Sequence, residues 1–149
     1  MTGQSGTARG FGTRAEANIP IINEYRANRT EKGPDERGAG LLLLTTTGAR
    51  SGLPRTSPLG YTTDAGHLIV VGAKGGAPGN PDWYRNLMVN PEVTVEQGPQ
   101  TFRALATEAE GGERIRLYEQ HVSLFPVYRD YEKKTDRLFP VVVLKRIDG

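Results

Sequence analysis

Arginines and hydroxyl-bearing residues gather around one turn of the sequence. An apolar run, Leu41–Leu44, passes into three threonines and a turn that contains Arg50, and a second segment begins with Arg55. Turns rich in Gly, Ser and Thr expose backbone N–H groups, and arginine keeps its charge, so this stretch suits a phosphate or carboxylate. It matches neither the GxxxxGK(S/T) nor the GxGxxG pattern. Taken alone, the stretch favours a β-hairpin with incidental surface arginines.

A second glycine-rich loop, Gly72–Pro81, follows about a dozen residues later and contains Lys74. Asn80 is a suitable N-cap and Pro81 suits the first position of a helix, so we expect a helix over Pro81–Asn90 that carries Trp83. The start of a helix offers unpaired N–H groups to an anion. The two loops and the tryptophan therefore predict a large, flat ligand with several negative charges.

Three motifs, in this order, carry a family resemblance: LLLLTTTGARSGLPRTSPL, VVGAKGG and NPDWYRNLMVNPEVTV. Together the region from Ile19 to Ile147 resembles the deazaflavin-dependent nitroreductase family. The resemblance implies an α+β split β-barrel that binds coenzyme F420 in a groove. It also implies hydride transfer from reduced F420 to a small molecule: a quinone, a nitroaromatic compound or an activated enone. An FMN-binding split-barrel reductase and a non-catalytic F420-binding protein remain open as alternatives.

The resemblance assigns the grip on the anionic cofactor tail to two neighbouring segments, Ala49, Arg50 and Ser51 with Arg55, Thr56, Ser57, Pro58, Leu59 and Gly60. It places the cofactor ring and linker against Val71, Gly72, Ala73, Lys74, Asp82, Trp83, Tyr84, Arg85 and Asn86. For the arginines and the lysine the alternative is a solvated surface. For Trp83 the alternative is a place in the hydrophobic core.

The segment Phe125–Tyr131 matches the part of the family that lines the substrate pocket and carries tyrosines. Tyr128 and Tyr131 are three residues apart and share a face of a helix. A phenol stacks on a ring and donates a hydrogen bond to an acceptor oxygen as negative charge develops there, so these two are the predicted catalytic residues. Packing of both rings on the barrel is the alternative. Ala73 and Phe125 stand where relatives often carry serine and tyrosine, which weakens the case for efficient nitroimidazole reduction.

Composition excludes several other classes of protein. The chain has 149 residues, a formal charge of +2 and no cysteine, which excludes disulfides and thiolate metal sites. His67 and His121 have no second ligand at metal spacing, so no metal is expected. The basic residues are scattered, which argues against nucleic-acid binding. Without a signal peptide or membrane-spanning run we expect a cytoplasmic protein, with peripheral membrane association left open. We expect a monomer, because the exposed strands are short and the sequence offers no obvious apolar dimer surface beyond its own core.

Hydrophobic periodicity predicts which elements position these residues. We expect a flexible tail over 1–14 and one F420-binding domain over 15–149. Val93 and Val95 alternate with Thr94 and Glu96, which is typical of a half-buried strand. The predicted strands are Leu41–Thr47, Arg55–Thr63, His67–Ala73, Glu92–Gln97, Gln100–Glu108 and Phe139–Ile147. Further helices are predicted over Ala15–Arg29, Gly112–Ser123 and Val127–Thr135. About six mainly antiparallel strands with peripheral helices make a small barrel of the α+β class, and the resemblance implies that it is a split β-barrel.

Overall fold

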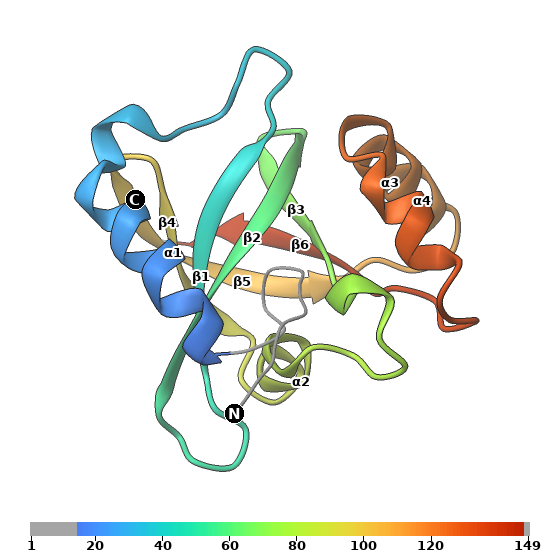
Figure 1. Cartoon of the computed structure of the whole chain (residues 1–149), viewed down its shortest axis with the longest axis horizontal. Helices are drawn as coiled ribbons and strands as arrows, with labels where there is room; N and C mark the ends of the chain where they lie inside the picture. Colours follow the sequence, from blue (N-terminus) through green and yellow to red (C-terminus); the bar gives the residue numbers. More distant parts are fainter. Residues whose placement is uncertain (1–14, 148–149) are drawn as a thin grey trace.

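A closed antiparallel β-barrel organises the computed structural model (Figure 1). The structure describes residues 15–147, so the predicted flexible tail over 1–14 lies outside the described residues. Within them, six strands are hydrogen-bonded in the order β1-β2-β3-β6-β5-β4, and every neighbouring pair is antiparallel. The predicted split barrel of the α+β class is confirmed.

The elements follow the predicted order along the chain. The strands are β1 (Gly40–Thr47), β2 (Pro54–Asp64), β3 (His67–Val71), β4 (Glu92–Gln97), β5 (Gln100–Glu108) and β6 (Val141–Arg146). The helices are α1 (Ala15–Ala27), α2 (Asp82–Val89), α3 (Gly111–Leu124) and α4 (Val127–Glu132), with short 3₁₀ turns η2 (Arg29–Glu31) and η3 (Lys74–Gly76). None of the described helices is long and apolar enough to cross a membrane.

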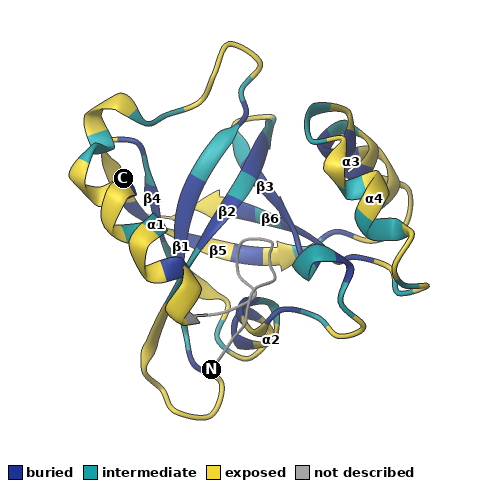
Figure 2. Ribbon diagram, in the orientation of Figure 1, coloured by how far each residue is buried: buried dark blue, intermediate teal, exposed yellow. Residues whose placement is uncertain are grey.

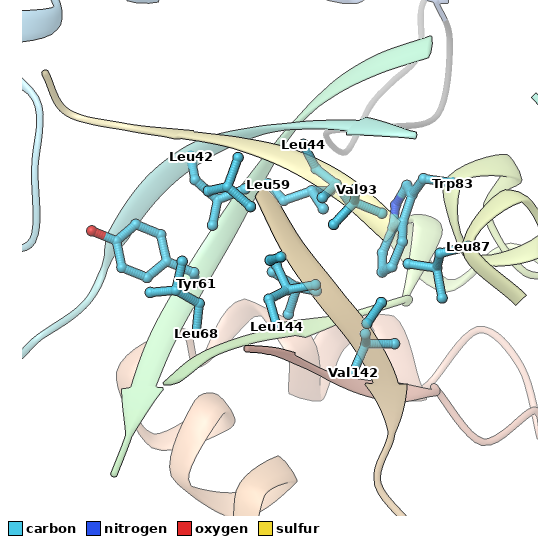
Figure 3. Close-up of a cluster of buried hydrophobic side chains, with 14 of the residues drawn as sticks. Leu42, Leu44, Leu59, Tyr61, Leu68, Trp83, Leu87, Val93, Val142 and Leu144 are labelled. Atoms are coloured by element: carbon cyan, nitrogen blue, oxygen red, sulfur yellow. The ribbon is translucent and has the colours of Figure 1, made fainter. Parts of the chain in front are cut away.

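The barrel interior is filled by side chains that alternate along the strands, as the period of two requires. Leu42 and Leu44 of β1 face Leu59 and Tyr61 of β2, and Trp83 of α2 closes the cluster (Figure 3). A second apolar cluster packs α3 against the other face of β3 and β6, and α4 packs beside it against α3 and η3. These helices lie on the opposite side of the barrel from α1 (Figure 1).

Helix α1 is fastened to the barrel by two polar side chains. The Tyr25 hydroxyl donates to the Leu41 carbonyl (3.0 Å) and accepts the Gly98 N–H (2.8 Å). The Arg26 guanidinium donates to both carboxylate oxygens of Glu96, at 3.1 and 2.7 Å. Glu96 lies on the expected polar face of β4, yet only 8 % of it is exposed, because α1 covers that end of the strand.

The expected cap of α2 is wrong. Pro81, rather than Asn80, occupies the N-cap position, and its side chain makes no capping bond. The Asn80 side-chain oxygen instead accepts a hydrogen bond from Arg137 Nη1 (2.6 Å). A charged donor makes a stronger hydrogen bond than a backbone amide, so the tertiary contact replaces the local one.

Candidate active site

A groove of about 760 Å³ opens between α1, the β1–β2 turn, the start of β2 and the first turn of α2. The exposed turn is visible in Figure 2. Most residues assigned to the cofactor tail line this groove, together with several that had been assigned to the ring and linker. These predicted residues are Ala49, Arg50, Ser51, Arg55, Thr56, Ser57, Asp82, Trp83, Arg85 and Asn86.

The three arginines of the groove differ in their partners. The Arg85 guanidinium pairs with the Asp82 carboxylate and donates to the Asn80 carbonyl (2.8 Å). Arg55 donates only to neutral oxygens, the Pro54 carbonyl at 3.3 Å and Ser51 Oγ at 3.4 Å. Neither Arg50 nor Arg55 forms an ion pair with any carboxylate of the described residues, and both are exposed. The turn therefore presents two cations whose charge is not neutralised within residues 15–147.

The Asn86 side chain of α2 stabilises the conformation of the β1–β2 turn. The Ala49 N–H donates to Asn86 Oδ1 (2.9 Å), and Asn86 Nδ2 donates to Thr46 Oγ1 (3.1 Å). Gly48 N–H closes the turn on the Leu53 carbonyl at 2.8 Å. Asn86 is buried, and both ends of its amide are bonded to protein groups, so its side chain braces the turn against α2.

A second, narrower cavity of about 100 Å³ lies between the barrel and α4. Its wall combines individually predicted residues from β2, β3, the loop at η3, α2 and α4 with three further residues. The individually predicted ones are Leu59, Gly60, Val71, Ala73, Lys74, Trp83, Tyr128 and Tyr131. Of the other three, Phe125 and Val127 belong to the segment predicted to line the substrate pocket, and Gly75 follows Lys74 in the loop. Trp83 lines both the groove and the cavity while only 3 % of it is exposed. It is a core residue and a wall residue at once.

The loop that carries Lys74 has a strained backbone. Lys74, Gly75 and Gly76 all lie in the left-handed region, with φ of 51°, 63° and 87°. For a residue with a Cβ this conformation costs about 1–2 kcal/mol. A Cβ at Gly76 would lie 2.6 Å from the Tyr131 carbonyl oxygen, so the loop and α4 approach each other too closely for any side chain there. Strain of this kind is typical of ligand-binding loops.

Tyr128 and Tyr131 form an aromatic pair over the cavity. Their ring centroids are 5.3 Å apart with the planes inclined by 64°, and Phe125 lies beside Tyr128. Burial raises the pKa of both tyrosines, so both hydroxyls are protonated at neutral pH and able to donate. The prediction that the two side chains share a face is confirmed by their common place in the cavity wall.

His121, one of the two histidines of the chain, packs against this pair through Tyr128. It is fully buried, and its ring packs edge-on against Tyr128 with centroids 4.8 Å apart. Nδ1 lies 3.4 Å from Thr62 Oγ1, while Nε2 has no hydrogen-bond partner within the described part of the chain. Burial lowers the pKa of His121 to about 4, so the ring is neutral at pH 7. It is a packing residue.

Three predicted residues line neither space. Pro58 is buried in β2 opposite Leu43. Gly72 is enclosed by two prolines, and a Cβ there would lie 2.9 Å from Pro140 Cγ. The Tyr84 hydroxyl donates to Glu108 Oε1 at 2.6 Å.

The groove also has lining residues that sequence reasoning missed, Asn18, Ile19 and Ile22 of α1. Their helical spacing marks one face of α1, but no local signal says that this face borders a ligand groove.

Comparisons with known proteins identify the family of this chain. The family model described as F420H(2)-dependent quinone reductase matches residues 20–146. An F420H(2)-dependent quinone reductase of Mycobacterium tuberculosis (strain ATCC 25618 / H37Rv) is 39 % identical over 108 residues, which are 70 % of this chain and 72 % of that protein.

Two solved structures are also similar. One, described as an F420-H2 dependent reductase, has a TM-score of 0.65 and 40 % identity, covering 70 % of this chain and 93 % of that one. Another, described as a domain-swapped dimer, has a TM-score of 0.68 and 33 % identity, covering 89 % and 100 %. The barrel fold and these comparisons together define the class of protein as split-barrel reductases that depend on F420H2. The chain belongs to the F420H(2)-dependent quinone reductase family, and the expected F420-dependent reductase is confirmed.

Proposed function

We propose that this protein reduces a quinone with F420H2, that the groove holds the anionic tail of the cofactor, and that the deazaflavin ring and the acceptor meet in the cavity. The observation that carries the proposal is the pair Arg50 and Arg55, exposed on the groove without a carboxylate partner in the described residues. Unneutralised cations beside an aromatic cavity suit a ligand with a charged tail and a flat ring.

The residues present fit such a cofactor. Arg50 and Arg55 would hold the phosphate and carboxylates of the tail, with the Thr56 and Ser57 hydroxyls as further donors along the groove. Trp83, which borders both spaces, would lie at the junction of tail and ring, and Lys74 would add a cation at the cavity. Hydride donation is the chemistry that reduced F420 supplies when bound.

On the acceptor side, Tyr128 and Tyr131 would donate hydrogen bonds to the oxygen of the acceptor. Both are held protonated by burial, which is the state needed to stabilise negative charge as it develops on that oxygen. The apolar wall of Leu59, Val71 and Ala73 excludes water from the same space. Nitroaromatic compounds and activated enones present oxygens of the same kind, and we propose them as further acceptors.

Side-by-side fluorescence titration with F420 and FMN tests the cofactor assignment. We expect tighter binding of F420, because FMN has a shorter anionic tail and would use fewer of the groove cations. Equal or tighter binding of FMN would contradict the proposal and favour the FMN-binding alternative.

Turnover separates a reductase from a non-catalytic F420-binding protein. Absorbance of F420 should return as F420H2 is consumed with a quinone, and parallel assays with a nitroaromatic compound and an enone rank the acceptors. If the protein binds F420 tightly but F420H2 is not consumed with the quinone, the nitroaromatic compound or the enone, the protein would be an F420 carrier rather than an enzyme.

We also propose that the protein acts as a cytoplasmic monomer. The similar structure described as a domain-swapped dimer makes its mass in solution the decisive measurement. Light scattering should give about 16.3 kDa. Twice that mass would replace the monomer with a dimer, and recovery in the membrane fraction of lysed cells would contradict the cytoplasmic location.

A further inference from the structure

The loop between β3 and α2 turns its oxygens toward a single side chain from a distant part of the sequence. Arg137 donates to the Gly72 carbonyl (3.1 Å), the Ala73 carbonyl (2.8 Å) and the Asn80 side chain (2.6 Å). Both Nε and Nη2 also donate to the Ala77 carbonyl, at 3.1 and 2.9 Å. One planar guanidinium thus fixes both ends and the middle of the loop.

Arg137 is itself held in place. Its backbone N–H donates to Thr135 Oγ1 (3.1 Å), and its guanidinium lies 4.9 Å from the centre of the buried Phe139 ring. Among residues 15–147 its hydrogen bonds go to neutral oxygens, and none of the ion pairs there includes it. Burial lowers the pKa of Arg137, although arginine remains charged at neutral pH.

The loop that Arg137 holds forms one wall of the cavity, through Ala73, Lys74 and Gly75. Lys74 adopts the left-handed conformation, which persists only where surrounding contacts hold it. At Gly76 the loop meets the Tyr131 carbonyl of α4, so its position also sets the distance of the tyrosine helix from the barrel.

The same side chain reaches the start of α2. Asn80 immediately precedes the N-cap of the helix that carries Trp83, and the Asn80 side chain is bonded to Arg137. Trp83 borders both the groove and the cavity. Two walls of the site therefore share one anchor that contacts neither space.

We propose that Arg137 is a positioning residue for the cofactor: it holds the Gly72–Asn80 loop so that Lys74 and Trp83 lie where the ring binds. This inference rests on the proposed function. The several N–H donors of the planar guanidinium hold the loop, because a single ammonium group does not reach oxygens that lie in several directions.

The test compares three variants of the full chain. Arg137→Met removes the donors and keeps an unbranched stem, and Arg137→Lys keeps the charge without the fork. Arg114→Met is the matched control: the Arg114 guanidinium likewise donates to a carbonyl, that of Phe139 (2.7 Å), and lies over the Tyr118 ring, but it borders neither the groove nor the cavity.

Hydrogen exchange of the ligand-free protein is the first readout. The amides of Gly76 and Ala77, bonded to the Ala73 and Lys74 carbonyls, should exchange faster in both Arg137 variants than in the wild type or the control. The second readout is F420 affinity, followed through the fluorescence of Trp83, the single tryptophan of the chain. Both Arg137 variants should raise the F420 dissociation constant roughly 10-fold to 100-fold, as expected when binding groups are displaced. The control should leave it unchanged at a comparable melting temperature.

Unchanged F420 affinity in Arg137→Met would overturn the inference. An Arg137→Lys variant that binds F420 as tightly as the wild type would also overturn it, because the charge of the side chain would then matter rather than the geometry of its donors. If Arg137→Met does not fold, the lysine variant decides by the same criteria. Failure of the wild type to bind F420 would instead refute the proposed function and this inference with it, and it is recognised without any variant.

Discussion

The groove and the cavity adjoin at Trp83, yet they are built in opposite ways. Cations of the groove, Arg50 and Arg55, stand on an exposed turn and have no carboxylate partner within the described residues. The cavity is walled by strands β2 and β3, the loop at η3 and helices α2 and α4, and its two tyrosines are half-buried. The groove presents positive charge to a ligand that remains solvated. The cavity presents apolar surface and the hydroxyl groups of two tyrosines.

This difference predicts different energetic consequences. Interactions in the groove are screened by salt and contribute mainly to binding. Interactions in the cavity act where water is excluded and negative charge develops, so they contribute mainly to turnover. Substitutions in the groove should therefore change mainly the cofactor dissociation constant, and substitutions in the cavity should change mainly kcat.

The largest effect is expected at Tyr128. Tyr128→Phe keeps the ring that packs on His121 and Tyr131 and removes only the hydroxyl. Loss of one such donor should lower kcat with a quinone roughly 10-fold to 1000-fold, while F420 affinity changes little. Stopped-flow or steady-state oxidation of F420H2 measures it. Wild-type turnover would make Tyr128 a wall of the cavity rather than a donor.

The groove arginines should change binding instead. Arg50→Ala or Arg55→Ala removes a charged donor worth about 1.5–3 kcal/mol, so the F420 dissociation constant should rise roughly 10-fold to 100-fold. Added salt should weaken binding by the wild type more than by either variant. Arg85→Ala is the control, because the Asp82 carboxylate already neutralises that guanidinium. Equal effects from all three substitutions would remove the distinction between paired and unpaired groove cations.

Low pH should lower the free energy of unfolding, because His121 is buried as a neutral ring beside the cavity. Its folded-state pKa of about 4 lies below the ordinary value of 6.5, so the unfolded chain binds more protons as the pH falls through this window. The stability that the neutral ring provides is present above pH 6.5 and is lost as the pH falls toward 4, by about 2 kcal/mol between pH 7 and pH 5. Urea unfolding of the wild type and His121→Gln at both pH values isolates this contribution. Parallel pH dependences of the two proteins would show that His121 does not titrate on unfolding.

The smallest effect is expected at Tyr131. It lines the cavity beside Tyr128, while the resemblance makes Tyr128 the nearer to the cofactor. Tyr131→Phe should lower kcat less than Tyr128→Phe does, by under about 10-fold, with the same assay as readout. A larger loss than in Tyr128→Phe would exchange the roles of the two tyrosines.

Much of the fold follows from local patterns. The alternation of apolar and polar residues predicted β4 and β5 with their observed bounds, Glu92–Gln97 and Gln100–Glu108. At Asn80 the local pattern predicted a cap, and the Arg137 contact overrode it. The alternation along β4 predicted that Glu96 points to solvent, but in the structure α1 covers it and Arg26 pairs with it.

By itself the sequence determined the turn with its two arginines, the strand periodicity that builds the barrel and the family to which the chain belongs. The turn and the periodicity depend on neighbours a few residues apart, whose backbone conformation and side-chain alternation are set locally, and the family is identified from the order of three motifs along the chain. Only the tertiary structure decided that Asn86 braces the turn, that Trp83 borders both spaces and that Arg137 holds a loop 65 residues away at Gly72. Such contacts exist only once the barrel closes and brings distant segments together, because a hydrogen bond depends on distance and angle in space rather than on separation along the chain.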